Sequence, residues 1–294
     1  MDFVIFDLEW NSGYCKKTKK FINEIIELGA VKVNEQMETI GQFSIFIRPE
    51  ITKRLNSKVK ELTQLTNEDL IHGATFNYAI SKFRKFTDGC VIMSWSTRDL
   101  SALEANCEYY NRSPKIPFLK RYADVQAYCQ DVIGSGKNQL ALQTAADMLD
   151  IRSDDVPLHR AVGDSILTAR ILKKLYDAER FAKYIRIVDD EFYARLNFHS
   201  TYIYDINNPL INNDDMFILC DVCSSKCEVK NGWKSRNKSF YADLYCPVCD
   251  KKMKGRIQYK LCYDGLSVTK RLIQNTEETP EDAAEDTESD TGEI

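Results

Sequence analysis

The chain has 294 residues, of which 44% are hydrophobic, enough for one large domain or for one domain with a small module beside it. Its formal net charge is −4, but residues 276–294 hold nine acids and no Lys or Arg, so the remainder, with 40 bases and 35 acids, is basic. A run of eighteen apolar residues is lacking, and Asp7 and Glu9 lie where a signal peptide needs its apolar core, so we expect an intracellular, cytoplasmic protein with no membrane partner.

Residues 4–10 form a short apolar run, rich in β-branched and aromatic side chains, which predicts a buried β-strand. Alternate side chains of a strand share one face, so Asp7 and Glu9 are expected to point the same way. Two neighbouring carboxylates resist burial unless a positive charge lies between them. The pattern favours a divalent-cation site on this strand, and the alternative is an edge strand whose polar face meets water.

The following residues predict alternating strands and helices. Residues 11–20 are polar and basic and predict a loop, while residues 24–34, 41–47 and 90–95 predict strands, the first two completing an antiparallel meander. Residues 118–128 fit either a strand or a helix, and residues 134–137 predict a flexible loop. Helices are predicted at residues 55–70, 76–87, 98–111, 140–149 and from about 157 to 176. This order indicates an α/β fold with a mixed sheet flanked by helices.

The composition changes along the chain and predicts four parts. The α/β domain is expected at residues 1–185, followed by a linker rich in Asn and Asp at residues 186–215. A small β module is expected at residues 216–275, and residues 276–294 predict a disordered acidic tail. The tail is either an inert solubilising end or a segment that covers a basic surface.

The small module contains two CxxC pairs separated by 22 residues, a spacing that closely resembles a zinc ribbon. Four thiolates fill the tetrahedral shell of zinc, so we expect one structural Zn²⁺ rather than a catalytic one. Buried thiol pairs or a redox pair are the alternatives, and Cys227 is an alternative ligand. The predicted ligands are Cys220, Cys223, Cys246 and Cys249.

Residues 220–271 hold twelve Lys or Arg against five acids, with aromatic residues between them. A basic and aromatic surface suits single-stranded nucleic acid, and the alternative is a face that docks another protein.

Four acids and one histidine in the first domain form the candidate catalytic set. Asp7 and Glu9 lie on the first predicted strand, Asp99 in the first turn of a predicted helix, and Asp164 in the last predicted helix, after His159. Carboxylate oxygens are hard ligands that select Mg²⁺ or Mn²⁺, and such a set could hold two of these ions. The alternative for His159 alone is a structural histidine at the start of the helix.

Five motifs in order make the chain resemble the DEDDh, or DnaQ-like, 3′–5′ exonuclease family, which has a ribonuclease-H-like fold. The motifs are residues 6–9, 24–31, 62–66, Trp95-Ser96 with Asp99, and residues 159–164. The resemblance covers about residues 1–180. It is strongest to the branch of histone-mRNA and small-RNA trimming exonucleases and sporulation-inhibitor-like proteins.

This resemblance implies roles for individual residues. Asp7, Glu9, Asp99 and Asp164 match the family's metal-binding acids, and His159 matches its general base. The substrate-binding positions that the resemblance implies are Leu8, Trp10, Leu65 and Trp95, with Leu65 against the terminal base.

The chain departs from the family pattern at Trp10, where a small residue is common, and at Gly163 and Ser165, where an acid and Ala are common. These departures leave substrate choice open.

The predicted function is therefore a metal-dependent 3′–5′ exonuclease that hydrolyses single-stranded nucleic acid with a free 3′ end to nucleoside 5′-monophosphates. RNA is the favoured substrate. The alternatives are a proofreading or repair exonuclease that acts on DNA, and a catalytically silent nucleic-acid-binding or scaffold protein.

Overall fold

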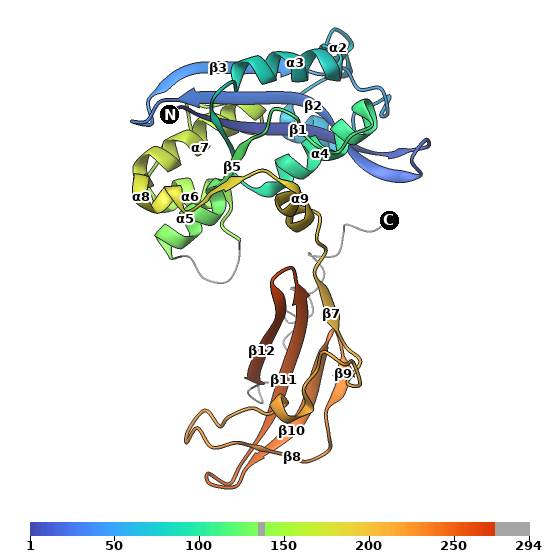
Figure 1. Ribbon diagram of the computed structural model, residues 1–294, viewed down its shortest axis with the longest axis vertical. Helices are drawn as coiled ribbons and strands as arrows, with labels where there is room; N and C mark the ends of the chain where they lie inside the picture. The colour runs from blue at the N-terminus through green and yellow to red at the C-terminus, as the bar shows by residue number, and fades with distance from the viewer. Residues whose placement is uncertain (135–138, 274–294) are drawn as a thin grey trace. The chain divides into compact units, whose positions relative to one another are not determined.

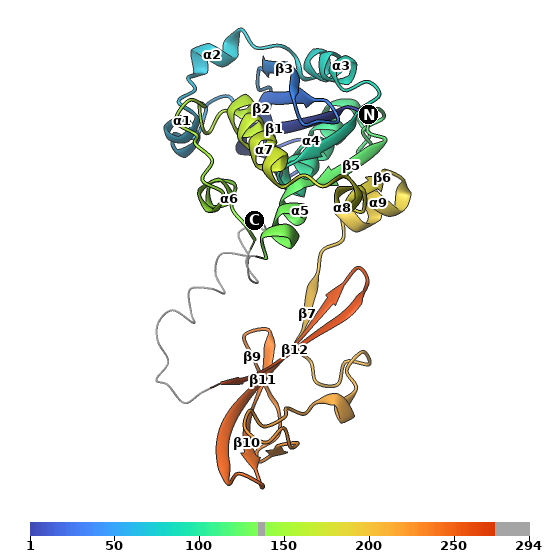
Figure 2. The same cartoon turned by 90° about the vertical axis from the view of Figure 1, so that its left-hand side faces the viewer.

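The computed structural model describes residues 1–134 and 139–273, which fall into two compact units divided after Leu196 (Figures 1 and 2). The predicted acidic tail and most of the predicted loop at residues 134–137 lie outside these residues. None of the helices in the described ranges is long and apolar enough to cross a membrane.

The first unit is built on a mixed sheet, which confirms the predicted fold class. Within residues 1–134 and 139–196 the strand order is β3-β2-β1-β4-β5-β6 (Figure 1). β1, β2 and β3 are antiparallel, β4 and β5 add in parallel, and β6 closes the far edge in antiparallel orientation. The strands are β1 (Phe3–Cys15), β2 (Lys20–Val33), β3 (Thr39–Phe46), β4 (Val91–Ser94), β5 (Arg121–Asp124) and β6 (Ile185–Ile187).

Helices cover both faces of this sheet, and each face has its own apolar core. One core packs α5, α6, α7 and α8 against side chains such as Phe3 and Ile5. The other packs α3, α4 and α9 against side chains such as Val4 and Phe6. The helices are α1 (Ser57–Thr63), α2 (Asn67–Ile71), α3 (Phe76–Phe86), α4 (Thr97–Asn111), α5 (Val125–Ile133), α6 (Leu142–Met148), α7 (Ala161–Leu175), α8 (Ala178–Ala182) and α9 (Asp190–Leu196).

The prediction of a loop at residues 11–20 is wrong, because β1 and β2 continue as a long hairpin whose turn lies between Cys15 and Lys20. A β-bulge between Glu9 and Trp10 shifts the register there. Asn11 is buried beyond the bulge, but its side chain donates to the Arg54 carbonyl and accepts from the Asn56 amide. Hydrogen bonding therefore lets a polar sequence continue the strand.

Two predicted helices have different bounds in the structure. The helix expected at residues 55–70 is divided into α1 and α2, because Gln64 takes a left-handed conformation with φ of 58° and Thr66 begins a new helix with a capping box to Asp69. The last helix of the unit begins at Ala161 rather than near residue 157, so His159 precedes it. The segment expected as strand or helix at residues 118–128 contains both β5 and the start of α5.

The second unit is a β module with its own core. Its strands pair in the order β12-β11-β10-β8, and β7 and β9 pair with β11 and β10. The segment predicted as a linker, residues 186–215, is partly regular, since it contains the end of β6, α9, β7 and a 3₁₀ turn. The elements of the module are β7 (Thr201–Ile203), η1 (Asn213–Asp215), β8 (Glu228–Val229), β9 (Lys234–Arg236), β10 (Ser239–Cys246), β11 (Lys251–Cys262) and β12 (Gly265–Ile273).

Candidate active site

The first strand presents two carboxylates on the face that α7 covers. Phe6 and Leu8 belong to the core on the opposite face, so the alternating Asp7 and Glu9 side chains point toward α7. In the β1–β2 ladder Asp7 lies opposite Gly29 and Glu9 lies opposite Glu27. Both β1 carboxylates are half-buried.

A glycine on β2 brings α7 onto the sheet beside these carboxylates. A Cβ atom at Gly29 would lie 2.1 Å from the Val162 nitrogen and 2.2 Å from the Ala161 carbonyl carbon. The backbones of β2 and α7 therefore touch where Gly29 pairs with Asp7. Ser165, one turn along α7, donates a hydrogen bond from its hydroxyl to the Gly29 carbonyl at 3.3 Å. This contact leaves Asp164, in the first turn of α7, facing β1.

The two departures from the family pattern next to Asp164 have a structural reason. Gly163 leaves room for the Pro157 carbonyl oxygen, which would lie 2.0 Å from a Cβ atom at this position. Ser165 is completely buried and donates to the carbonyls of Gly29 and Ala161. Both residues thus serve the close packing of the helix start.

Three of the predicted acids come together from β1 and α7. One carboxylate oxygen each from Asp7, Glu9 and Asp164 lies within 4.8 Å of the other two. Asp99, in the first turn of α4, lies beside this group but outside it. Its Oδ1 atom accepts a hydrogen bond from the Leu8 amide at 3.2 Å, which ties the start of α4 to the strand between the two β1 carboxylates.

Burial and mutual repulsion raise the pKa values of all four acids. Burial, with the Asp164, Glu27 and Asp99 charges added, raises the pKa of Glu9 to about 8. Burial likewise raises the pKa of Asp99 to about 7, and it raises the pKa of Asp7 with support from the Asp99, Asp164 and Glu9 charges. Acids crowded in this way are stable as carboxylates when a cation lies among them. The donor set, made of carboxylate oxygens, fits a hard divalent cation such as Mg²⁺ or Mn²⁺.

His159 lies in the turn that leads into α7 and is exposed to solvent. Its φ of 57° places it in the left-handed region, which only a minority of residues other than glycine adopt. Burial raises the pKa of Asp164, whereas the charge and the backbone amide of His159 lower it, so the histidine is close to this acid. The imidazole is therefore accessible beside the carboxylate group.

A partly buried ion pair, which the sequence did not indicate, supports this turn. Arg160 donates to both carboxylate oxygens of Glu27, at 2.9 and 3.1 Å, and its guanidinium lies over the Phe46 ring. The Glu27 side chain is completely buried, so Arg160 supplies the positive charge that it needs. Glu27 lies in the motif at residues 24–31 and Arg160 in the motif at residues 159–164, but their separation of 133 residues leaves no signal of pairing in the sequence.

The predicted substrate-binding side chains are mostly in the core. Leu8 is 3% exposed and points away from the carboxylates, so only its backbone is on the site's side. Leu65 is buried against Ile26, and Trp95 is buried and donates from Nε1 to the Leu140 carbonyl. Trp10 is half-buried and packs against the core behind the sheet. Side-chain contacts of Leu8 with substrate are incompatible with this burial.

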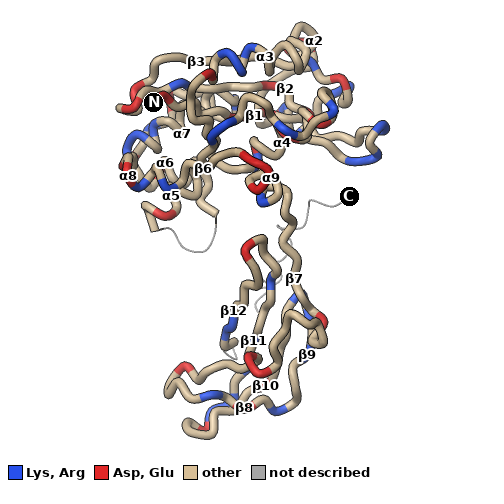
Figure 3. Tube along the Cα trace, viewed as in Figure 1, with Lys and Arg blue, Asp and Glu red and all other residues tan. Residues whose placement is uncertain are grey.

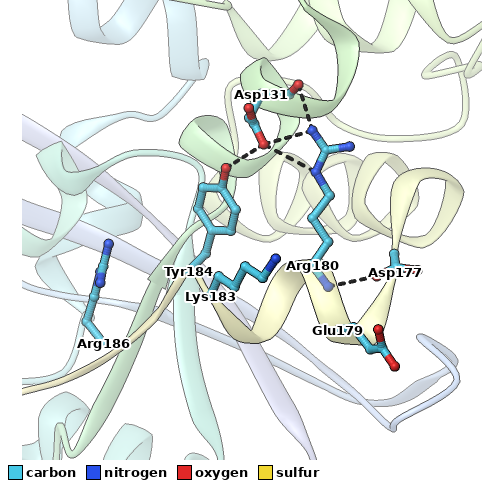
Figure 4. Close-up of a pocket in the computed structure, with 7 residues that line it drawn as sticks. All are labelled: Asp131, Asp177, Glu179, Arg180, Lys183, Tyr184 and Arg186. Carbon is cyan, nitrogen blue, oxygen red and sulfur yellow. Dashed lines mark hydrogen bonds and ion pairs between the residues drawn. The ribbon is translucent and has the colours of Figure 1, made fainter.

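A separate cavity of about 560 Å³ lies between α5 and α8 and does not contain the predicted acids (Figure 4). Arg180 is already paired there with Asp131, which also accepts from the Tyr184 hydroxyl (Figure 4). Three acids and three bases line the cavity, so its charges are balanced. The carboxylate group on β1 and α7 is the stronger candidate for chemistry.

The four cysteines predicted as zinc ligands gather in the second unit. One sulfur from each lies within 4.8 Å of the other three, with 3.4 Å between Cys223 and Cys246 and 4.0 Å between Cys220 and Cys249. A tetrahedron with Zn–S bonds of about 2.3 Å has edges of roughly 3.8 Å, so the sulfurs fit one zinc ion. Cys227 is buried nearby but is not one of this group.

Comparisons with known proteins agree with this architecture. A family model described as Exonuclease, of the RNase T type, matches residues 4–172. The probable 3′–5′ exonuclease KapD of Bacillus subtilis is 26% identical over 180 residues, which cover 60% of this chain and 85% of that protein. The PolC-type DNA polymerase III of Mycoplasma pneumoniae is 28% identical over 178 residues, but only 11% of that protein is covered.

Two solved structures share the fold of the first unit. A 3′-exonuclease in a structure describing 3′-end specific recognition of a histone mRNA stem-loop has a TM-score of 0.54 at 21% identity, covering 65% of this chain and 91% of that one. The nuclease domain of 3′hExo, a DEDDh family member bound to rAMP, has a TM-score of 0.53 at 22% identity, covering 64% and 96%.

Proposed function

Because the chain belongs to the RNase T exonuclease family and is a 3′–5′ exonuclease, we propose that it is of the DEDDh type. Asp7, Glu9, Asp99 and Asp164 then bind two Mg²⁺ or Mn²⁺ ions for hydrolysis of single-stranded RNA. The observation that carries this proposal is the meeting of Asp7, Glu9 and Asp164 oxygens within 4.8 Å. Their raised pKa values indicate that the group needs added positive charge.

When bound, the cations would supply two effects: a lower pKa for an attacking water and neutralisation of charge on the phosphate oxygens. The four carboxylates would hold these charges beside the terminal phosphodiester. Asp99 is oriented by the Leu8 amide, and Asp164 is placed by the contact of α7 with Gly29. Positioning of this kind accounts for much of the rate enhancement in phosphoryl transfer.

His159 takes the proton from the attacking water as general base. The water oxygen bonds to phosphorus, the bond to the 3′ oxygen of the preceding nucleotide breaks, and that oxygen leaves as a 3′ hydroxyl. The product is a nucleoside 5′-monophosphate, and the strand becomes one nucleotide shorter. An exposed imidazole beside Asp164 suits this role, because it can reach the water without displacing a core side chain.

RNA is the proposed substrate because the five motifs resemble the RNA-trimming branch of the family. DNA is the second candidate, since the chain is also similar to PolC-type DNA polymerase III. Matched RNA and DNA strands of one sequence, each labelled at the 5′ end, separate the two. Faster shortening of the DNA strand would contradict the choice of RNA.

The test of the catalytic assignment is Mn²⁺-dependent shortening of a 5′-labelled oligoribonucleotide by the full chain. Asp7→Ala and Asp164→Ala should each abolish shortening, while Asp154→Ala, at an exposed acid near the start of α7, should not. Circular dichroism verifies that the variants are folded. Wild-type activity in either site variant would overturn the assignment, as would an inactive wild type that only binds the strand.

A further inference from the structure

The sheet of the second unit has one face in the core and one face that carries basic side chains. On β11 the side chains of Met253, Ile257 and Tyr259 point into the core, and Gly255 lies among them. The alternate positions on the same strand point the other way, and they are Lys252, Lys254, Arg256, Gln258 and Lys260. Lys and Arg residues are visible along this part of the chain in Figure 3.

Neighbouring strands extend this surface, because residues paired across an antiparallel ladder point to the same side. Arg271 of β12 lies opposite Arg256, and Lys234 of β9 lies opposite Tyr241. Three tyrosines share the surface: Tyr241 is paired with Arg256, Tyr245 with Lys252, and Tyr202 of β7 with Lys260. We call this surface the basic face; its bases are Lys234, Lys252, Lys254, Arg256, Lys260 and Arg271.

The charges of the basic face are not balanced within the described residues. Asp243, which is paired with Lys254, and Glu228, which is paired with Tyr245, are acids on the same surface, and Glu228 forms an ion pair with Lys230. Within residues 1–134 and 139–273, none of the six bases forms an ion pair with a carboxylate. Arg256 and Arg271 are directly opposed, and like charges in that position destabilise a sheet. An anion on the surface would remove this repulsion.

Aromatic rings lie among these cations. The Arg256 guanidinium lies 5.9 Å from the centre of the Tyr241 ring, and the Lys260 ammonium lies 5.4 Å from that of Tyr202. A cavity of about 300 Å³ adjoins the Lys252 end, with Lys254 and Tyr245 among its lining residues. Nucleic-acid bases stack on aromatic rings irrespective of sequence, while phosphates pair with Lys and Arg.

Strand geometry matches the same ligand. Alternate residues of a strand are about 6.8 Å apart, so Lys252, Lys254 and Arg256 form a regular row of positive charges. The row suits the regularly spaced phosphates of an extended strand. An acidic protein would satisfy the charges but would not need the interleaved rings, so the observations favour nucleic acid.

We propose that the basic face binds the backbone and bases of single-stranded nucleic acid, as a surface additional to the carboxylate site. The inference rests on the proposed function in that the bound strand is the substrate. A strand held by the second unit is kept at high local concentration for the first unit, because the two units belong to one chain. Long strands should therefore gain affinity that very short substrates do not.

The test compares two sets of substitutions that remove three charges each. The face variant is Lys252→Gln, Lys254→Gln and Lys260→Gln in the full chain. The control is Lys82→Gln, Arg84→Gln and Lys85→Gln on α3, which covers the sheet face opposite Asp7 and Glu9. Fluorescence anisotropy with a 20-nucleotide RNA measures binding, and Asp164→Asn in each protein keeps the strand uncut. Hydrolysis of a dinucleotide, measured without Asp164→Asn, reports on the carboxylate site alone.

The face variant should bind the 20-nucleotide RNA at least about tenfold more weakly than the control, and the slope of log Kd against log salt should fall by about 2. Its dinucleotide hydrolysis should equal that of the wild type, and a variant with Lys252→Arg, Lys254→Arg and Lys260→Arg should bind normally. RNA affinity equal to that of the control would overturn the proposal and leave an acidic protein as the ligand. Lack of dinucleotide hydrolysis by the wild type would count against the proposed function alone, because the binding comparison does not depend on it.

Discussion

Gly29→Ala is expected to damage the carboxylate site without changing any of its acids. The added Cβ atom would lie 2.1 Å from the Val162 nitrogen and 2.2 Å from the Ala161 carbonyl carbon. Non-bonded heavy atoms prefer separations of about 3.5–4.0 Å, so β2 and α7 would have to part by more than about 1 Å. Backbone atoms cannot rotate away as the end of a long side chain can, so the start of α7 must move.

Movement of α7 changes both stability and activity. Overpacking of this kind typically costs about 1–3 kcal/mol in the free energy of unfolding. Asp164 moves with α7 away from Asp7, which pairs with Gly29, and a misplacement of about 1 Å can cost roughly 100-fold in rate. Chemical denaturation measures the first effect. Mn²⁺-dependent shortening of a 5′-labelled oligoribonucleotide, at a temperature where the variant is folded, measures the second.

Gly41→Ala provides the matched control on β3 of the same sheet. Its Cβ atom would approach Phe86 at 3.4 Å, near ordinary van der Waals contact, so activity and stability should stay close to those of the wild type. Wild-type stability and activity in Gly29→Ala would refute the view that backbone contact between β2 and α7 positions Asp164. Equal losses in both variants would refute it as well, because they would show a general effect of alanine in this sheet.

Three further predictions concern charge and metal. Arg160→Met should lower the free energy of unfolding by about 3 kcal/mol, measured by chemical denaturation, because the Glu27 carboxylate is left buried without a cation. Adding Glu27→Gln should restore most of this loss. No loss of stability in Arg160→Met would contradict the importance of the pair. Burial and neighbouring acids raise the pKa of Glu9 from 4.5 to about 8, so between these pH values the metal-free folded protein holds a proton that the unfolded chain releases. The stability of the metal-free protein should therefore fall as pH rises through this range, and the gain in Tm on adding Mn²⁺ should be larger near pH 8.5 than near pH 6. A gain in Tm that is independent of pH would argue against the carboxylates as ligands. Metal analysis should find one zinc per chain in the wild type and less than one in Cys246→Ser. Trp233 fluorescence should also change in that variant, because this ring packs on the core that holds the cysteines. Unchanged zinc content in Cys246→Ser would exclude Cys246 as a ligand.

Much of the fold follows from patterns of apolar residues. The strand at residues 4–10 was predictable because it is a short apolar run that both cores bury, and the helices near residues 76–87 and 98–111 were predictable because each buries one regular face. The strand structure of residues 11–20 was not predictable, because their polar side chains are compatible with either a loop or a strand in solvent. The break between α1 and α2 depends on the left-handed Gln64, which has no distinctive composition.

The sequence predicted which residues form the site better than it predicted what brings them together. The residue types and order of the motifs predicted that Asp7, Glu9 and Asp164 would meet, and their oxygens lie close together. Sequence alone could not reveal that Gly29 allows this meeting, since a glycine in a strand is consistent with several causes. The burial of Leu65 and Trp95 was equally hidden, because apolar residues suit both a core and a binding surface.

The bulge after Glu9 separates the first hairpin into an inner and an outer part. The inner ladder is held in register by apolar cores on both faces of the sheet, whereas the outer arm ends in a turn with exposed lysines. Insertions or deletions near Cys15–Lys20 should therefore leave the Asp7 and Glu9 carboxylates in place. We expect relatives to differ in the length and sequence of this arm, which makes it the natural place for substrate range to diverge during evolution.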